Sequence, residues 1–520
     1  MKSPHTRRQF LAEVGKGMLV ATVGTEVASE FGLGIARAAD APAALNFGDL
    51  EPLVVFMQET PVNRLMPALV EKINAGTDLR KLVGAAALAN ARTFGGEDYV
   101  GFHTMMALSP AFRMSQELPE THRALPVMKV LYRNTNRIQE RGGRTNEILR
   151  ALAPAGQSEA RGTTPSFRDG VHRKDMAASE QIFAGIAAQS LDEAFNELLH
   201  IVQENPEVHR VVLPYRAWDL LDVVGRDQAL TLLRQSVHYC VQGEDWAARS
   251  PHDEPRTLLP RVLEEHHLVD RQPGTREVED AWIEKMVNTF FTSTPQEAAN
   301  AAAAALAEGI APAAIGEAIA LTANQLVLRD QGRRPRDESN GKPPGSVHGD
   351  SIGVHASDAA NAWRNLARVG NPRNTFACLI IGAYQVARDR TDRGGDFAQW
   401  EPLPLRQHIE SIKTTDPGQL LKEAEEAIRG NLQARAAALI SRYGALGHEA
   451  RGAFNLLLRY AVSEDGALHA EKYYRTVSEE FVATRPAFRW RQLTALARVT
   501  ASEFGRPAPG IAEACGLLKV

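Results

Sequence analysis

The chain has 520 residues, of which 44% are hydrophobic, 23% are charged and 6% are aromatic, and its formal net charge is −4. These values are ordinary for a globular protein, and the slightly negative charge excludes the basic surface of a nucleic-acid-binding protein. Frequent alanines and few aromatic residues favour helices over β-sandwiches. The sequence therefore predicts an all-α protein that does not bind nucleic acid.

The N-terminus carries a paired arginine, Arg7-Arg8, followed by Gln-Phe-Leu and by a weakly apolar stretch from Gly17 to Gly24. This pattern resembles a bacterial twin-arginine export signal, and Ala36-Arg37-Ala38 fits a small-x-small cleavage site. We expect residues 1–38 to be a signal peptide that the twin-arginine export machinery recognises and that is cleaved near Ala38. The mature chain, 39–520, would then be periplasmic or extracellular. The alternative is an ordinary N-terminal helix.

The rest of the sequence excludes several classes of protein. No later apolar run reaches the roughly 20 residues that a transmembrane helix needs. Cys240, Cys378 and Cys515 are far apart and form no C-x-x-C pattern. This spacing argues against cysteine-ligated clusters, covalently attached haem and a disulfide framework.

Helical signals recur along the chain in a repeated order. Val100-Gly101-Phe102-His103 resembles Ile352-Gly353-Val354-His355, and Ala-Phe-Asn precedes both His209 and His469. Each histidine falls between an Ala- or Leu-rich helix and a later helix. Such units bury their apolar faces by stacking on one another. We therefore expect a single domain of about four divergent helical-hairpin or three-helix repeats, near 60–145, 190–245, 295–392 and 435–505, winding around a central site.

Two stretches interrupt this pattern. Residues 153–174 are rich in Pro, Gly and polar residues, which is typical of a linker. Residues 329–349 form a long insertion between the two helices of the third unit. Long insertions are functional lids or disordered surface loops, and the position of this one beside a histidine favours a lid.

The four repeated histidines are the main candidates for a functional site. They occupy one position in each predicted unit, so a common axis would bring their side chains together. Imidazole is a frequent ligand of iron, copper, zinc and nickel. The predicted metal ligands are His103, His209, His355 and His469.

Further side chains lie near these histidines in the sequence. His348 is seven residues before His355 and would share a helix face with it, while His200 and His238 belong to the second unit. These three histidines are additional candidate ligands. Asp350 and Asp358 are the candidate catalytic residues, which would orient a ligand or transfer protons.

Other interpretations of the histidines stay open. Each imidazole could bond a neighbouring carbonyl in a purely structural role, or the histidines could form a metal-free acid–base site. The run from Glu264 to Asp270, which contains His266 and His267, is another candidate ligand group, although it is also typical of a solvated helix end.

Gly-x-His at helix starts and His348 followed by His355 before an Ala-rich helix resemble the questin oxidase-like proteins, over 346–390 and more weakly over 97–135. The resemblance implies a helical oxygenase with histidines at recurring helix starts. Those enzymes are linked to NADPH, which an exported protein would lack.

These observations predict an exported oxidoreductase that depends on a metal or cofactor and acts on a small-molecule substrate. The cofactor would be a transition metal, iron or copper rather than zinc, or a non-covalent haem. The alternative is a non-catalytic helical-repeat scaffold that binds a partner in the cell envelope.

Overall fold

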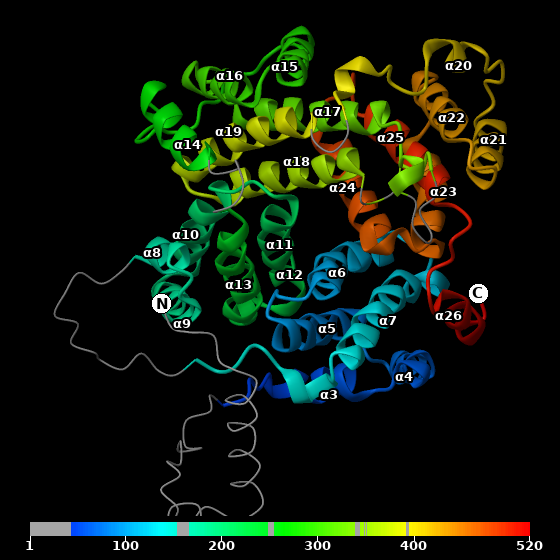
Figure 1. Cartoon of the computed structure of the whole chain (residues 1–520). Helices are drawn as coiled ribbons and strands as arrows, with labels where there is room; N and C mark the ends of the chain where they lie inside the picture. The colour runs from blue at the N-terminus through cyan, green and yellow to red at the C-terminus, as the bar shows by residue number, and fades with distance from the viewer. Residues whose placement is uncertain are drawn as a thin grey trace, which may run out of the picture. The chain divides into compact units, whose positions relative to one another are not determined.

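The computed structural model describes residues 43–152, 166–247, 254–337, 344–347, 349, 351–391 and 395–520 (Figure 1). The predicted signal peptide, residues 1–38, lies outside this part of the chain. One compact unit holds Met1–Leu45 and Arg150–Pro154, and its described residues include a β-bridge between Ala44 and Arg150. The second unit holds Asn46–Leu149 and Ala155–Val520 and contains the four repeated histidines.

The described part of the chain is helical and contains only isolated β-bridges, so the predicted all-α class is confirmed. In these ranges every helix is too short or too polar to cross a bilayer. The helices that do not belong to the four histidine-containing groups given next are α3 (Glu51–Glu59), α4 (Val62–Asn74), α8 (Phe167–His172), α9 (Met176–Gln189), α12 (Leu221–Val224), α14 (Glu254–Glu265), α15 (Asp280–Thr292), α16 (Pro295–Ala307), α20 (Arg406–Glu410), α21 (Pro417–Arg429), α22 (Gln433–Ala445) and α26 (Ile511–Leu518).

The remaining helices follow the predicted order of helix, turn, helix with a histidine in its first turns, and third helix. They are α5 (Leu79–Phe94), α6 (Tyr99–Glu117) and α7 (Ala124–Glu140); α10 (Leu191–Gln203), α11 (Val208–Asp219) and α13 (Ala229–Ala247); α17 (Pro312–Arg329), α18 (Ile352–Val369) and α19 (Pro372–Asp389); and α23 (Ala450–Ser463), α24 (His469–Ala483) and α25 (Trp490–Glu503). The equivalence of the four groups as structural repeats stays a prediction.

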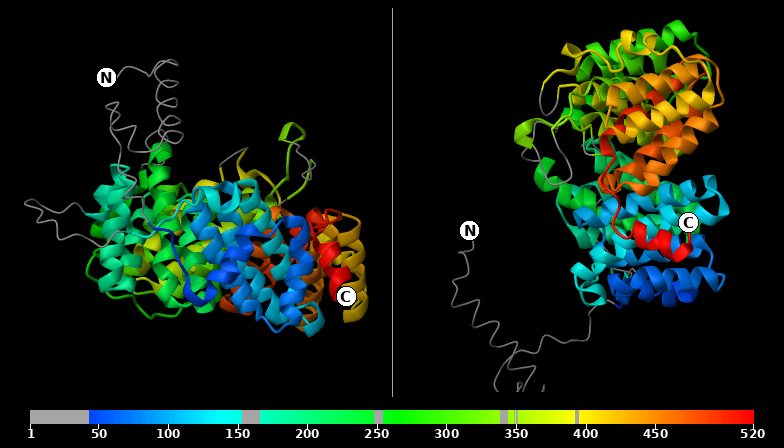
Figure 2. Two further views of the ribbon diagram at one scale, coloured as in Figure 1. Left: turned by 90° about the horizontal axis from the view of Figure 1, so that it is seen from below. Right: turned by 90° about the vertical axis from the view of Figure 1, so that its right-hand side faces the viewer.

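Four of these helices surround one point. Helix α11 packs against α6 and α18, and α24 packs against the same two helices, so the four form a closed ring of neighbours (Figure 1). At the other end of the chain, α26 returns to pack beside α4 and α7 (Figure 2).

Side-chain contacts give the direction of three of the four central helices. Between α18 and α24, Thr476 donates to Asp358 at 2.8 Å and Arg364 pairs with Glu480 at 2.6 Å. Both contacts lie further along the two helices than the histidines do. Tyr215 of α11 likewise donates to Glu479 of α24. Helices α11, α18 and α24 therefore leave the histidine end in the same sense.

Local sequence explains where these helices begin. The Asp98 side chain accepts from the Gly101 amide at the start of α6, and the Ser351 hydroxyl accepts from the Val354 amide at the start of α18. Such N-caps satisfy amides that have no partner within the helix. Gly353 lets α18 approach α17 closely, because a Cβ there would lie 2.6 Å from the Val327 backbone.

The sequence predicted two interruptions of the helical pattern, a linker at 153–174 and an insertion at 329–349, and the structure differs between them. Most of the linker lies outside the described residues, but its end forms helix α8, so 153–174 is not a continuous loop. The missed feature is a capping box, in which Ser166 and Asp169 bond each other's backbone amides. In the insertion, α17 extends to Arg329, and the described residues beyond it include only a short 3₁₀ helix, Pro335–Asp337.

Candidate metal centre

The four repeated histidines meet in space, as predicted. The Nε2 atoms of His103 and His209 are 3.2 Å apart, and those of His355 and His469 are 3.1 Å apart. The rings also approach between these pairs, with centroids 5.2 Å apart for His103 and His469 and 5.6 Å apart for His209 and His355. We call this closed set of four imidazoles the histidine ring.

Three of the imidazoles are oriented through their Nδ1 atoms. Nδ1 of His103 lies 2.6 Å from the Tyr99 carbonyl oxygen, and Nδ1 of His469 lies 3.1 Å from the Ala467 carbonyl oxygen. Nδ1 of His209 lies 2.6 Å from a carboxylate oxygen of Glu207. Carbonyl and carboxylate oxygens only accept, so these nitrogens carry the proton. In the neutral form of these three rings, Nε2 therefore carries a lone pair.

The surroundings of the ring oppose its protonation. Burial, the nearby charge of Lys472 and the neighbouring imidazoles hold the pKa values of His103 and His469 well below the ordinary value. The two side chains are almost fully buried. We infer that both remain neutral, which is the form that binds metal ions.

A layer of charged side chains lies one or two helical turns beyond the ring. Asp358 follows His355 by three residues, Lys472 follows His469 by three, and Arg216 follows His209 by seven. All three side chains are buried. Burial raises the pKa of the Asp358 carboxyl and lowers the pKa of the Lys472 ammonium to about 8.

The ring is more accessible from one side than from the other. His209 and His355 are half-buried, and the exposed ring of Tyr99 lies 4.4 Å from the His103 ring and 6.0 Å from the His209 ring, centroid to centroid. On the other side, Gly349 packs so closely on His469 that a Cβ would lie 2.0 Å from the His469 Cβ. Gly349, at the end of the insertion, thus lies directly against His469.

The distances within the ring can be compared with those of a metal site. Four nitrogens at 2.0–2.1 Å from a tetrahedral ion lie about 3.3 Å apart. The two Nε2 pairs are close to this separation. Among the described residues, however, no group of three or more His, Cys, Asp or Glu side chains could hold a metal ion as it stands. Metal binding by the ring would therefore need these side chains to rearrange.

The other predicted site residues have different positions. His238 lies on α13 and places its two nitrogens 2.8 Å from Glu97 and 2.7 Å from Glu180, so neither is free to join the ring. His200 lies on α10, where burial and nearby arginines lower its pKa to about 4. Its proposed ligation therefore has no support from the geometry, and the same is true of His238. His348 and Asp350 lie outside the described residues.

The Glu264–Asp270 run also lies apart from the ring. It forms the end of α14 and the turn after it, where His266 bonds Asn300 of α16 at 3.3 Å. This placement agrees with a solvated helix end.

The sequence prediction missed three residues at the ring. Glu207 orients His209 and also caps α11, and its position two residues before the histidine could have revealed it. Lys472 could have been found because it follows its histidine by three residues, as Asp358 does. Arg216 lies on the His209 face of α11, but its burial could not be foreseen for an arginine.

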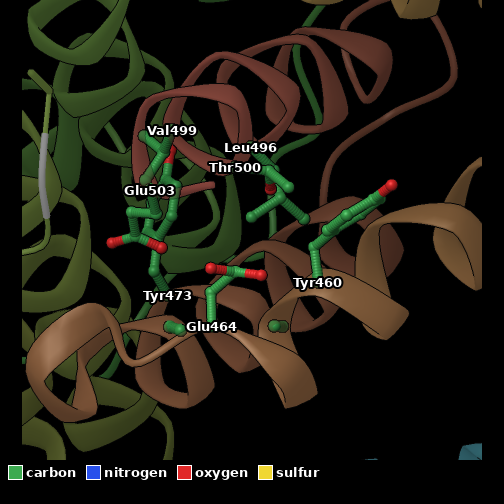
Figure 3. Close-up of a pocket in the computed structure, with 9 residues that line it drawn as sticks. Tyr460, Glu464, Tyr473, Leu496, Val499, Thr500 and Glu503 are labelled. Atoms are coloured by element: carbon green, nitrogen blue, oxygen red, sulfur yellow. The ribbon is translucent and has the colours of Figure 1, made fainter. Parts of the chain in front are cut away.

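Apart from the histidine ring, a small space lies between α23, α24 and α25 (Figure 3). Its volume is about 10 Å³, which is enough for one water molecule. Tyr473, Glu464 and Glu503 line it, and burial raises the pKa of the Glu503 carboxyl to about 8. This space is too small for a substrate.

Comparison with known proteins adds no family assignment, since no family model, curated protein or solved structure matches the chain.

Proposed function

We propose that the histidine ring binds one transition-metal ion and that the chain is an exported, metal-dependent oxidoreductase acting on a small-molecule substrate. The observation that carries the proposal is the pairing of lone-pair-bearing Nε2 atoms, His103 with His209, at 3.2 Å. Two facing lone pairs repel each other, but a metal ion between the two Nε2 atoms would accept both of them as ligands. The hydrogen bonds made by Nδ1 are those that ligating histidines usually make.

Two other interpretations account for the ring less well. In a purely structural role, the Nε2 lone pairs of His103 and His209 would each receive a donor, but these two atoms face each other at 3.2 Å. In a metal-free acid–base site, one imidazole would be protonated and donate to the next. Burial and the charge of Lys472 disfavour that proton at His103 and His469.

The same geometry bears on the identity of the cofactor. The Nε2 atoms of each close pair are 3.1–3.2 Å apart, a separation that favours two ligands of one small ion over two ligands on opposite faces of a haem. An all-imidazole ligand set suits copper, iron, zinc or nickel. Bound copper or iron would supply one-electron redox chemistry, which zinc lacks, so we favour these two metals.

Asp358 is the residue that we expect to handle protons at this site. Its carboxyl is buried, accepts from Thr476 at 2.8 Å and is influenced by Lys472, Arg216 and His209. Burial raises its pKa, which moves the carboxyl toward the range in which it both accepts and releases a proton.

Metal analysis of protein purified from the periplasm tests the proposal. We expect about one copper or iron ion per chain, and its loss in H355A and H469A while far-UV circular dichroism stays helical. H448A is the matched control, because His448 is partly exposed, lies outside the ring and bonds the Thr415 carbonyl through its Nε2 atom. Retention of the metal in both ring variants would contradict the proposal.

A surface groove supports the alternative function, that of a scaffold protein that binds a partner. It has a volume of about 830 Å³ and lies between the end of α6, α21 and α23. Such a groove suits a partner segment, and that function needs no metal. Protein that is metal-free after purification under metal-replete conditions would favour this alternative.

A further inference from the structure

The side chain of Lys472 has an environment that folding alone does not explain. It is 2% exposed, and among the described residues it makes no hydrogen bond and no ion pair. The nearest charges that act on it are those of Asp358, Glu471 and Arg216. Buried ammonium groups are otherwise paired, because an unpaired one loses its hydration without compensation.

The neighbouring carboxylates already have partners. Glu471 forms a 2.7 Å ion pair with Lys129, and Asp358 accepts from Thr476. Asp358 also faces the second buried cation, Arg216, whose nearest carboxylate oxygens, on Glu479 and Asp219, are 3.6 and 3.7 Å away. Lys472 therefore has an ammonium group whose hydrogen-bonding capacity is unused.

The N-termini of four helices add to the positive electrostatic potential at the histidine ring. His103, His209, His355 and His469 all lie in the first turns of their helices, so four helix N-termini meet at the ring. Each N-terminus carries a partial positive charge and favours an anion. A divalent metal ion held by four neutral imidazoles would add further positive charge that no ligand balances.

We propose that Lys472 binds an anionic ligand of the histidine ring, so that the substrate or co-substrate of this site is a small anion. This inference rests on the proposed function, since it names the ligand class of the same site. The anion would accept hydrogen bonds from the Lys472 ammonium and bind the metal through its other end. Charge-assisted hydrogen bonds of this kind are among the stronger ones in proteins.

The size of the anion follows from the packing of the ring. The imidazole centroids are 4.7–5.6 Å apart, and Gly349 closes the side of His469. Entry is left to the half-buried side, near His209, His355 and the exposed Tyr99. A confined entry of this kind suits an anion of two or three heavy atoms better than a bulky one.

Azide is the probe for the test, because it is a monoanion of three atoms. Its dissociation constant is measured by isothermal titration calorimetry at constant ionic strength, on samples whose metal content is determined in parallel. K472M keeps the length of the side chain and removes the charge. K422M is the control, since Lys422 is exposed on α21.

We expect K472M to weaken azide binding by about tenfold or more, as the loss of a charge-assisted hydrogen bond implies, with unchanged metal content. We also expect its Tm to rise, because an unpaired buried charge is removed. K422M should match the wild type in both. Unchanged azide affinity in K472M overturns the inference, and so does a lower Tm or failure to fold, which would show a structural role.

The proposed function and the anion inference are contradicted by different results. A wild-type protein without metal contradicts the metal-dependent oxidoreductase. The anion inference then survives only if the metal-free protein binds azide and K472M abolishes that binding. Azide binding that is absent from the wild type, with or without metal, overturns the inference.

Discussion

The Nε2 atoms of His103 and His209 face each other at 3.2 Å although the Nδ1 atom of each ring is bonded to an oxygen of its own helix start. Two neutral imidazoles in these tautomers have no proton to share across the contact. In that neutral form the two lone pairs face each other, and a metal ion between them would bind both, so the residues that fix the tautomers are as informative as the histidines themselves.

Glu207 gives a direct test of this tautomer control. In E207A, the His209 Nδ1–H loses its carboxylate acceptor, and the imidazole is no longer held in one orientation. We expect metal affinity to fall by about 10- to 100-fold, as is usual when such partners are removed. Competition with a chromophoric chelator measures the change.

Glu207 is also the N-cap of α11, so its loss destabilises the helix by about 1 kcal/mol. T294A is the matched control, because Thr294 caps α16 through the Glu297 amide and lies outside the ring. T294A should lose similar stability and keep its metal affinity. Equal metal affinity in E207A and the wild type would remove Glu207 from the site.

The export prediction is tested at the paired arginine. R7K/R8K keeps the positive charge but loses the planar guanidinium groups of the pair. We expect an unprocessed precursor to accumulate in the cytoplasm, detected by immunoblotting of cell fractions, whereas the wild type appears in the periplasm at its mature size. Normal export of R7K/R8K would leave residues 1–38 as an ordinary N-terminal segment.

Repetition in the sequence predicted the site better than any single motif did. His103, His209, His355 and His469 were recognisable because each follows a similar helix at a similar distance, and positions of that kind meet when helices pack around one axis. His238 was misplaced because membership of a unit does not fix the face on which a side chain lies. Its partners, Glu97 and Glu180, come from other elements and have no local sequence pattern. Likewise, the lack of a charged partner for Lys472 among the described residues results from the packing of the helices, and no local sequence pattern indicates it.

His238 makes stability depend on pH. Although burial alone would lower its pKa, hydrogen bonds to Glu180 and Glu97 and their charges raise it. The folded protein then holds a proton that the unfolded chain releases at about pH 6.5. This stabilisation is complete below that pH and is lost as the pH rises through the folded-state pKa, by at most about 1.4 kcal/mol per pH unit.

Urea denaturation at several pH values between 6 and 9 measures this effect as a difference between variants. We expect the gap in unfolding free energy between the wild type and H238Q to be largest at pH 6 and to shrink at higher pH. H122Q, at an exposed histidine, should follow the wild type throughout. A gap that is constant over this range would mean that His238 is neutral in the folded protein.

The strongest stability prediction concerns the buried pair Lys129 and Glu471, whose side chains are 1% and 0% exposed. Lys129 also donates to the Ala461 and Glu464 carbonyl oxygens, so it ties α7 to the end of α23. K129M leaves the Glu471 carboxylate buried without its partner. We expect a loss of about 3–5 kcal/mol in the free energy of unfolding, measured by chemical denaturation.

A double-mutant cycle separates the charge from the packing. K129M/E471Q removes both charges, so it should be more stable than K129M alone, although the two carbonyls stay without their donor. R429M is the control, because the Arg429–Glu425 pair lies on the surface, where solvent screens the attraction between the two charges. If E471Q brought no recovery in the K129M background, the cost would come from the lost carbonyl contacts and the packing of the stem. The charge of Glu471, which faces Lys472 as well, would then have to be balanced by that second lysine.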